Sequence, residues 1–130
     1  MTEVGPGSLV HWEFVSEDPS RTRPFLEAVF GWEFRTVPGV DYQVFTAPSG
    51  PGGAVVRASA EQSRGVLNYV LSTSLEDDLR KIEEAGGRVR VGKTEIPHIG
   101  WWALFEEPTG LVLALFQSLG PDWGPIARYR

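Results

Sequence analysis

His11 and Glu13, two side chains capable of acid–base chemistry, lie two residues apart in segment 9–15. This segment alternates polar and apolar residues, and successive side chains of a β-strand point to opposite faces. We therefore expect a strand with His11 and Glu13 on a solvated face and with Trp12 and Phe14 on an apolar face. An imidazole that titrates near neutral pH could act as a general base or a binding donor, which makes His11 and Glu13 the candidate catalytic residues. A structural histidine bonded to a neighbouring strand is the alternative.

Size and composition exclude several classes of protein. The chain has 130 residues, of which 42% are apolar, and this size predicts one compact domain. The 17 acidic residues outnumber the 12 basic ones, which disfavours binding to nucleic acid. No apolar run approaches the roughly 20 residues of a membrane helix, and the first ten residues lack a signal-peptide pattern. We expect a cytoplasmic protein with no membrane partner and, since it has no cysteine, no disulfide.

The hydrophobic pattern of the first half predicts a strand, a helix and three further strands. The first strand covers residues 9–15, and Asp18 with Pro19 can cap the helix that Gly31 ends. Pro24 removes one backbone hydrogen bond inside that helix. The three following strands are predicted at residues 32–37, 42–47 and 53–57.

The second half repeats this order at an offset of about 55 residues. A strand over residues 66–72 precedes a helix that Ser74 caps and that the glycines at 86–87 end. A strand at 88–91 and a hairpin around the turn at 106–110 complete the repeat. The prediction is an α+β fold of tandem βαβββ modules, at about 8–58 and 65–117, followed by a tail at 118–130, all within one domain of residues 1–130.

Several short motifs occur in the order and spacing of a known superfamily. They are Asp18-Pro19, Phe30-Gly31-Trp32-Glu33, Gly86-Gly87, Lys93-Thr-Glu-Ile-Pro97, Gly100-Trp101 and Pro108-Thr-Gly110. With the tandem modules, they resemble the glyoxalase, bleomycin-resistance and extradiol-dioxygenase proteins, also called the vicinal oxygen chelate superfamily. The resemblance is closest to the uncharacterised branch labelled "predicted enzyme related to lactoylglutathione lyase". It implies a cupped mixed sheet whose concave side holds a ligand and whose convex side carries the helices.

The same resemblance bears on metal binding. Metal-dependent members hold a divalent ion on side chains from the first, fourth, fifth and eighth strands. The matching positions here are His11, residues 54–57, Leu67 or Asn68, and Ala114. Of these, His11 is the one strong ligand, since the amide of Asn68 is a weak ligand and Ala114 cannot bind an ion. We therefore expect no cofactor and loss of the inherited metal site. A divalent ion at His11 with other partners is the less favoured alternative.

Four residues are expected to bind ligand in the cup. Asn68 would meet the polar end of the ligand beside His11 and Glu13. Trp101 and Phe116 would meet its apolar body, and the small Ala114 beside Phe116 would leave an apolar cavity where the metal would have been. This expectation assumes that Trp101 and Phe116 share the inward face of their strands.

Three functions remain open. The first is a small-molecule-binding protein without the inherited metal, either ligand-sequestering or catalysing an unknown metal-free reaction. The second is a divalent-metal-dependent lyase, isomerase or dioxygenase of the same superfamily that uses His11. The third is a non-catalytic interaction domain. Five tryptophans in 130 residues also predict a homodimer, because they exceed what one small core readily hides.

Overall fold

The computed structural model describes residues 4–38, 42–48 and 50–120. These residues form two helices and eight strands of a mixed sheet, which confirms the α+β fold and the tandem βαβββ order. Neither helix is long and apolar enough to cross a membrane. The elements are β1 Leu9–Ser16, α1 Pro19–Phe30, β2 Glu33–Thr36, β3 Gln43–Thr46, β4 Gly53–Arg57, β5 Gly65–Leu71, α2 Leu75–Glu84, β6 Arg88–Ile96, β7 Gly100–Glu106 and β8 Val112–Ser118.

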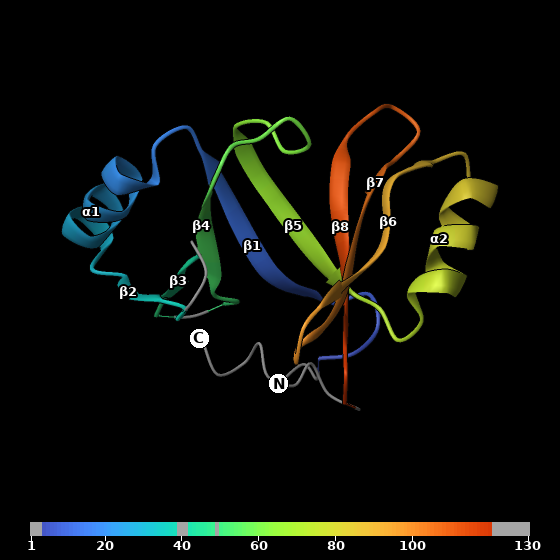
Figure 1. Ribbon diagram of the computed structural model, residues 1–130, viewed down its shortest axis with the longest axis horizontal. Coiled ribbons are helices and arrows are strands. Elements are labelled where there is room, and N and C mark those ends of the chain that lie inside the picture. The colour runs from blue at the N-terminus through green and yellow to red at the C-terminus, as the bar shows by residue number, and fades with distance from the viewer. Residues whose placement is uncertain (1–3, 39–41, 49, 121–130) are drawn as a thin grey trace. The chain divides into compact units, whose positions relative to one another are not determined.

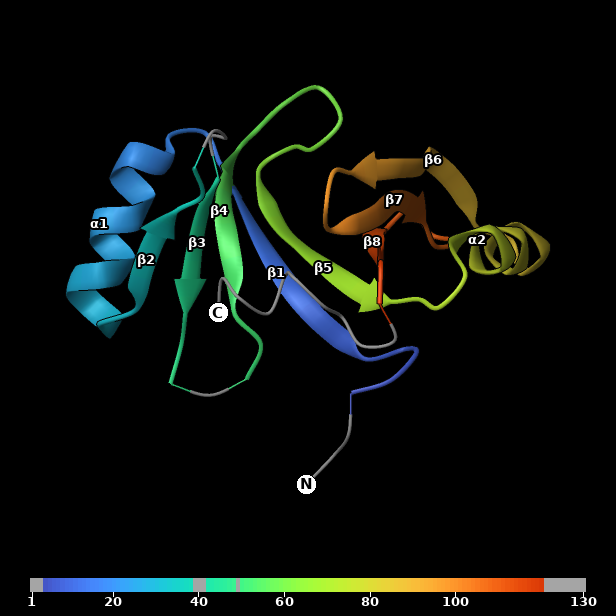
Figure 2. The same ribbon diagram turned by 60° about the horizontal axis from the view of Figure 1, so that its bottom comes forward.

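The first half has the strand order β2-β3-β4-β1 and carries α1 beside β2 to β4 (Figures 1 and 2). β1 and β4 are parallel, whereas β3 pairs antiparallel with both β2 and β4. Aromatic side chains fill the layer next to the helix: Trp32 stacks on Phe45 with ring centroids 4.7 Å apart, and Phe14 lies 5.9 Å from Trp32. Phe14 therefore packs on the apolar face of β1, as the alternation of the sequence predicted.

The boundaries of α1 follow from its capping residues, as predicted. The Asp18 side chain accepts hydrogen bonds from the Ser20 amide at 3.2 Å and from the Ser20 hydroxyl at 2.6 Å. At the other end, Gly31 adopts a left-handed φ of 68° and its amide donates to the Glu27 carbonyl oxygen. Glycine adopts this conformation without strain, so the helix ends where the sequence indicates.

Asp18 should make the stability of the first half dependent on acid. The hydrogen bond from the Ser20 hydroxyl is the main cause that lowers the pKa of Asp18 below its ordinary value of 3.8. A depressed folded-state pKa stabilises the fold above pH 3.8, and this contribution is lost as the pH falls through the folded pKa. Because asparagine caps helices about as well, Asp18→Asn should show a shallower loss of stability between about pH 5 and pH 2 in urea denaturation. If the free energies of unfolding of the two proteins fell in parallel as the pH is lowered, Asp18 would not be the source of this acid dependence.

The second half has the order β5-β8-β7-β6 and places α2 next to β6 (Figures 1 and 2). Ser74 caps α2 by accepting from the Asp77 amide at 3.3 Å, as predicted. The core of this half is formed by Leu75, Ala103 and Leu115, whose side chains are at most 4% exposed. Leu75 opens the helix and the other two lie on β7 and β8, so α2 covers this face of the hairpin.

β6 is longer than the sequence predicted. The predicted strand covered residues 88–91, but Thr94 pairs with Trp102 and Ile96 pairs with Gly100. The register shifts twice before Thr94, so the strand contains bulges. A bulge inserts an unpaired residue and lets pairing resume beyond it, which an alternation rule applied to sequence does not detect.

The contacts of the backbone group the chain into two compact units. Residues 4–10 belong with residues 68–120, and residues 11–67 form the other unit. Within the first of these, the Gly7 amide donates to the Leu71 carbonyl oxygen at 2.9 Å, and the Leu71 amide donates to that of Ser8 at 2.8 Å. The division of one domain at about 8–58 and 65–117 stays a prediction, and the tail beyond residue 120 lies outside the described residues.

His98 holds a backbone conformation that costs stability. Among the residues that the structure describes, His98 is the one non-glycine residue with a positive φ, which is 67°. It lies in the turn between β6 and β7. A side chain in this region costs roughly 1 kcal/mol, and asparagine tolerates it better than most residues. His98→Asn should therefore raise the free energy of unfolding by about 0.5 kcal/mol, whereas the β-branched His98→Val should lower it. Equal changes in both variants, measured by urea denaturation, would show that backbone strain is not responsible.

Candidate functional site

The face of β1 that carries His11 and Glu13 is buried. His11 is 3% exposed and Glu13 is 6% exposed, while Trp12 and Phe14 on the other face are half-buried. The expectation that the polar face would be solvated is therefore wrong. Buried polar groups are stable when they have hydrogen-bond partners, and both side chains have partners from distant parts of the first half.

The Tyr42 hydroxyl joins His11 to Glu13. It lies 2.6 Å from His11 Nε2 and donates to Glu13 Oε2 at 2.9 Å. The imidazole and phenol rings are nearly parallel, with an interplanar angle of 12° and centroids 6.1 Å apart. Tyr42 comes directly before β3 and is half-buried. Tyr42 is therefore the more exposed partner of this buried pair.

Gln62 supplies the second donor to Glu13. Its side-chain Nε2 donates to Glu13 Oε1 at 3.2 Å, so both carboxylate oxygens accept a hydrogen bond. Gln62 lies in the connection between β4 and β5, where Ser59 holds it in place. The Ser59 amide donates to the Gln62 carbonyl oxygen at 2.8 Å, and the Gln62 amide donates to Ser59 Oγ at 3.2 Å.

We call His11, Glu13, Tyr42 and Gln62 the polar network. It contains an imidazole, a phenol and a carboxylate in hydrogen-bond contact, which are groups that can hold or move a proton. Its half-buried members, Tyr42 and Gln62, can hydrogen-bond to a polar ligand. Sequence analysis identified the two β1 residues and missed these other two.

β4 brings no metal ligand to this network. Ala54 pairs with Glu13 on one side and with Val44 on the other, so the three side chains share a face. Both apolar residues are buried. The face of β4 that adjoins Glu13 thus presents the methyl group of Ala54 and no group that could bind a metal.

The predicted ligand-binding residues of the second half divide between two faces. Trp102 pairs with Phe116, and Ala114 pairs with both Leu104 and Tyr69. Paired side chains point to the same side of a sheet, so Ala114 and Phe116 share a face, as predicted. Both are buried, at 0% and 1% exposure.

Trp101 and Asn68 lie on the opposite face, next to α2. Trp101 packs against the core cluster that contains Leu75, and Lys93 Nζ lies 4.6 Å from the centroid of its ring. Asn68 precedes Tyr69, the partner of Ala114, so its side chain points away from Ala114. The expectation that Trp101 shares a face with Phe116 is wrong, because a hairpin register shifted by one residue exchanges the two faces.

The residues present do not fit the divalent metal that the sequence resemblance brings into question. Within residues 4–38, 42–48 and 50–120, no three His, Asp or Glu side chains are grouped so that they could hold an ion. His11 Nε2 and Glu13 Oε2, the strongest donors near the expected site, both contact the Tyr42 hydroxyl. An ion at His11 Nε2 would have to displace that contact. The expectation of a metal-free protein remains a prediction.

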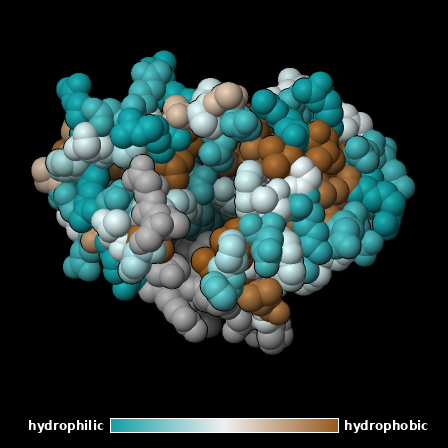
Figure 3. Space-filling model, in the orientation of Figure 1, coloured by the Kyte–Doolittle hydropathy of each residue, from teal (hydrophilic) through white to brown (hydrophobic). Residues whose placement is uncertain are grey.

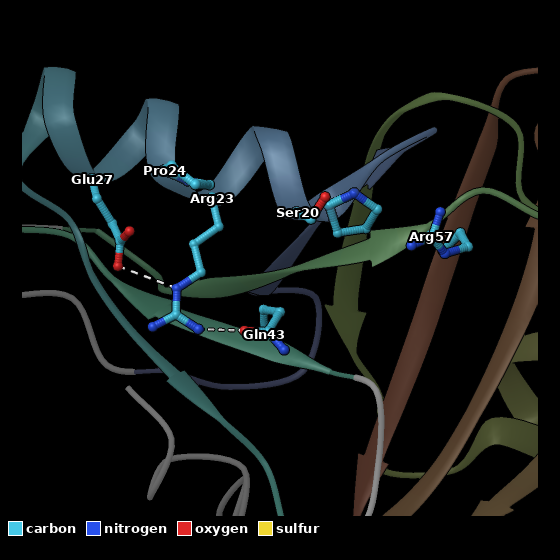
Figure 4. Close-up of a pocket in the computed structure, with 7 residues that line it drawn as sticks. Ser20, Arg23, Pro24, Glu27, Gln43 and Arg57 are labelled. Carbon is cyan, nitrogen blue, oxygen red and sulfur yellow. Dashed lines mark hydrogen bonds and ion pairs between the residues drawn. The ribbon is translucent and has the colours of Figure 1, made fainter.

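A pocket of about 290 Å³ lies elsewhere, against α1 (Figure 4). Its Arg23 side chain reaches towards Glu27 and Gln43, and it also lies over the Phe34 ring at 5.3 Å. Arg57 donates to the Glu17 carbonyl oxygen at 3.1 Å. Because both cations are engaged and the pocket contains no buried acid or base, we favour the polar network as the candidate site. The lining residues are Pro19, Ser20, Arg23, Pro24, Glu27, Gln43 and Arg57.

No protein-family model and no curated protein matches the sequence. Solved structures do match the fold. A methylmalonyl-CoA epimerase from Mycobacterium tuberculosis matches with a TM-score of 0.68 and 13% identity, over 92% of this chain and 94% of the epimerase. A glyoxalase/bleomycin resistance protein/dioxygenase superfamily member from Vibrio splendidus 12B01 matches with a TM-score of 0.63 and 16% identity, over 86% and 99% of the two chains.

A third structure carries a different description. It is described as an NAD-dependent benzaldehyde dehydrogenase from Legionella pneumophila, and it matches with a TM-score of 0.65 and 12% identity, over 83% of this chain and 97% of that one. Similarity at such low identity defines the fold and leaves the reaction open.

Proposed function

From the glyoxalase-like, vicinal oxygen chelate fold of this chain, we propose that it binds a small molecule at the polar network without the inherited divalent metal. The observation that carries the proposal is the buried contact of His11 and Glu13 with the Tyr42 hydroxyl. The same fold serves a methylmalonyl-CoA epimerase, an enzyme whose name states a small-molecule substrate.

The energetics of burial support a binding role over a purely structural one. A buried ionisable group costs several kcal/mol unless it is well paired, and an apolar core of similar volume is often as stable or more stable. A buried histidine and glutamate therefore need a reason beyond packing. Placing their half-buried partners Tyr42 and Gln62 within reach of a ligand provides one, because such a site combines few polar groups with apolar walls.

A thermal-shift screen of small molecules tests this proposal. Compounds that bind the polar network should stabilise the parent protein and should lose at least half of that shift in His11→Ala. Trp101→Ala is the matched control, because Trp101 packs on the α2 side and its loss should leave the shift intact. Compounds that stabilise His11→Ala as strongly as the parent would show that they bind elsewhere.

The metal-free part of the proposal is tested by elemental analysis of the purified protein. The expected result is well below one zinc, nickel, manganese or iron per chain, because Ala54 and Ala114 replace ligands that the family's site requires. About one ion per chain, lost in His11→Ala, would instead support the metal-dependent lyase, isomerase or dioxygenase.

We also propose that the protein forms a homodimer. Phe25, Val29 and Phe30 of α1 are each more than half exposed, although apolar side chains gain stability when buried. In the space-filling view the apolar, brown atoms gather mainly on the right, over the second half, within a mostly polar surface (Figure 3). A dimer in light scattering at micromolar concentration, converted to a monomer by Val29→Glu, is the expected result. A monomer in the parent protein would contradict the proposal.

A further inference from the structure

We infer that His11, Tyr42 and Glu13 form a proton relay in which His11 donates a hydrogen bond to the Tyr42 hydroxyl and that hydroxyl passes its proton to Glu13. This inference rests on the proposed binding site and names its chemistry. Tyr42 is the member through which a proton enters from a ligand, and Glu13 is the member that stores it. The ligand would then be a small molecule that gives up a proton from oxygen, nitrogen or an activated carbon.

The direction follows from counting protons. The phenol has one proton, and its oxygen lies within hydrogen-bond distance of both His11 Nε2, at 2.6 Å, and Glu13 Oε2, at 2.9 Å. Two hydrogen bonds need two protons, so one neighbour of the phenol must donate while the other accepts. Either His11 Nε2 carries a proton and Glu13 is a carboxylate, or Glu13 is protonated and His11 Nε2 is bare.

The surroundings of Glu13 select the first arrangement. Gln62 Nε2 donates a hydrogen bond to Glu13 Oε1, the oxygen that does not contact the phenol. A hydrogen bond donated to a carboxylate favours its charged form, and a charged Glu13 can only accept from the phenol. His11 must then carry its proton on Nε2 and donate to the phenol.

This arrangement allows a proton to be stored without a charged tyrosine. As a ligand proton forms a bond to Tyr42 Oη, the bond between Oη and its own proton breaks, and that proton forms a bond to Glu13 Oε2. The ligand has lost one proton, Tyr42 is unchanged, and Glu13 is neutral. The reverse movement returns a proton to the ligand, so the relay needs no metal and no other reactant.

Burial explains why Tyr42 is the entry point. His11 and Glu13 are 3% and 6% exposed, so a ligand has little direct access to their reactive atoms. Tyr42 is half-buried and in contact with both. The phenol thus gives a buried carboxylate access to a ligand, and Glu13 acts through it.

Nitrogen-15 NMR of the imidazoles in the ligand-free protein tests the relay. At neutral pH the expected His11 spectrum has a protonated Nε2, and the exposed His98 in the same sample is the reference. Tyr42→Phe should remove the preference for a proton on His11 Nε2 and so shift the populations of the two tautomers. Glu13→Gln, which removes the charge at the end of the relay, should weaken it.

A His11 that is protonated at Nδ1 with a bare Nε2 in the parent protein would overturn the inference, since the relay would then run the other way. An unchanged tautomer in both variants would also overturn it. Because no ligand is used, these outcomes are independent of the thermal-shift screen. A protein with the expected tautomer but no ligand at the polar network would refute the proposed function and leave standing only the direction of the hydrogen bonds among His11, Tyr42 and Glu13.

Discussion

Gly53→Ala is expected to lower the free energy of unfolding by about 3 kcal/mol, among the larger effects of a single substitution. Gly53 pairs with Trp12 across β4 and β1. An added Cβ would lie 2.1 Å from the Trp12 carbonyl oxygen and 3.0 Å from Phe45 Cζ. The backbone of β1 would have to move, and it carries His11 and Glu13, so binding at the polar network should also be lost.

Gly92→Ala is the matched control for this substitution. Gly92 also lies in a strand, β6, but a Cβ there would meet no atom within 4 Å. Its free energy of unfolding in urea should stay within about 0.5 kcal/mol of the parent value. Equal free energies of unfolding for Gly53→Ala and Gly92→Ala would contradict the close approach of the β1 and β4 backbones at Gly53.

Tyr42→Phe is expected to weaken binding of a screened ligand at least tenfold, or roughly 1.4 kcal/mol. The substitution removes one oxygen and keeps the ring. It leaves His11 Nε2 and Glu13 Oε2 without their common partner, and an unsatisfied buried polar group costs about 1–3 kcal/mol. The free energy of unfolding should fall by a similar amount, which urea denaturation measures.

Thr36→Val provides the control, because it also removes one hydroxyl from the first half. The Thr36 hydroxyl donates to Gln43 Oε1 at 3.2 Å in an exposed position. Calorimetry should give the same ligand affinity for Thr36→Val as for the parent protein. Equal ligand affinities of Tyr42→Phe and the parent protein would show that the Tyr42 hydroxyl does not contribute to binding.

The fold could be predicted because its signals are local. The capping residues Asp18 and Ser74 each accept hydrogen bonds from residues two or three positions on, so a short window of sequence contains the whole interaction. Gly31 ends α1 through its own backbone conformation. The strands follow from alternation within a few residues. The extension of β6 past residue 91 was missed, because a bulge interrupts that alternation.

The site could be predicted only in part, because its contacts are distant in sequence. His11 and Glu13 were identified together since they share a face of one strand. Tyr42 and Gln62 contact Glu13 from 29 and 49 positions away, and no local pattern connects them to it. The placement of Trp101 failed for a related reason, since the faces of β7 and β8 match only when the register of the hairpin is known.

A crystal structure of the protein with a ligand found by the thermal-shift screen tests the central claim most directly. The polar network is predicted to bind the ligand, so a polar atom of the compound should lie within hydrogen-bond distance of the Tyr42 hydroxyl or of the Gln62 side chain. Density for the compound between Arg23 and Arg57 in the α1 pocket, with none at Tyr42 or Gln62, would contradict the account.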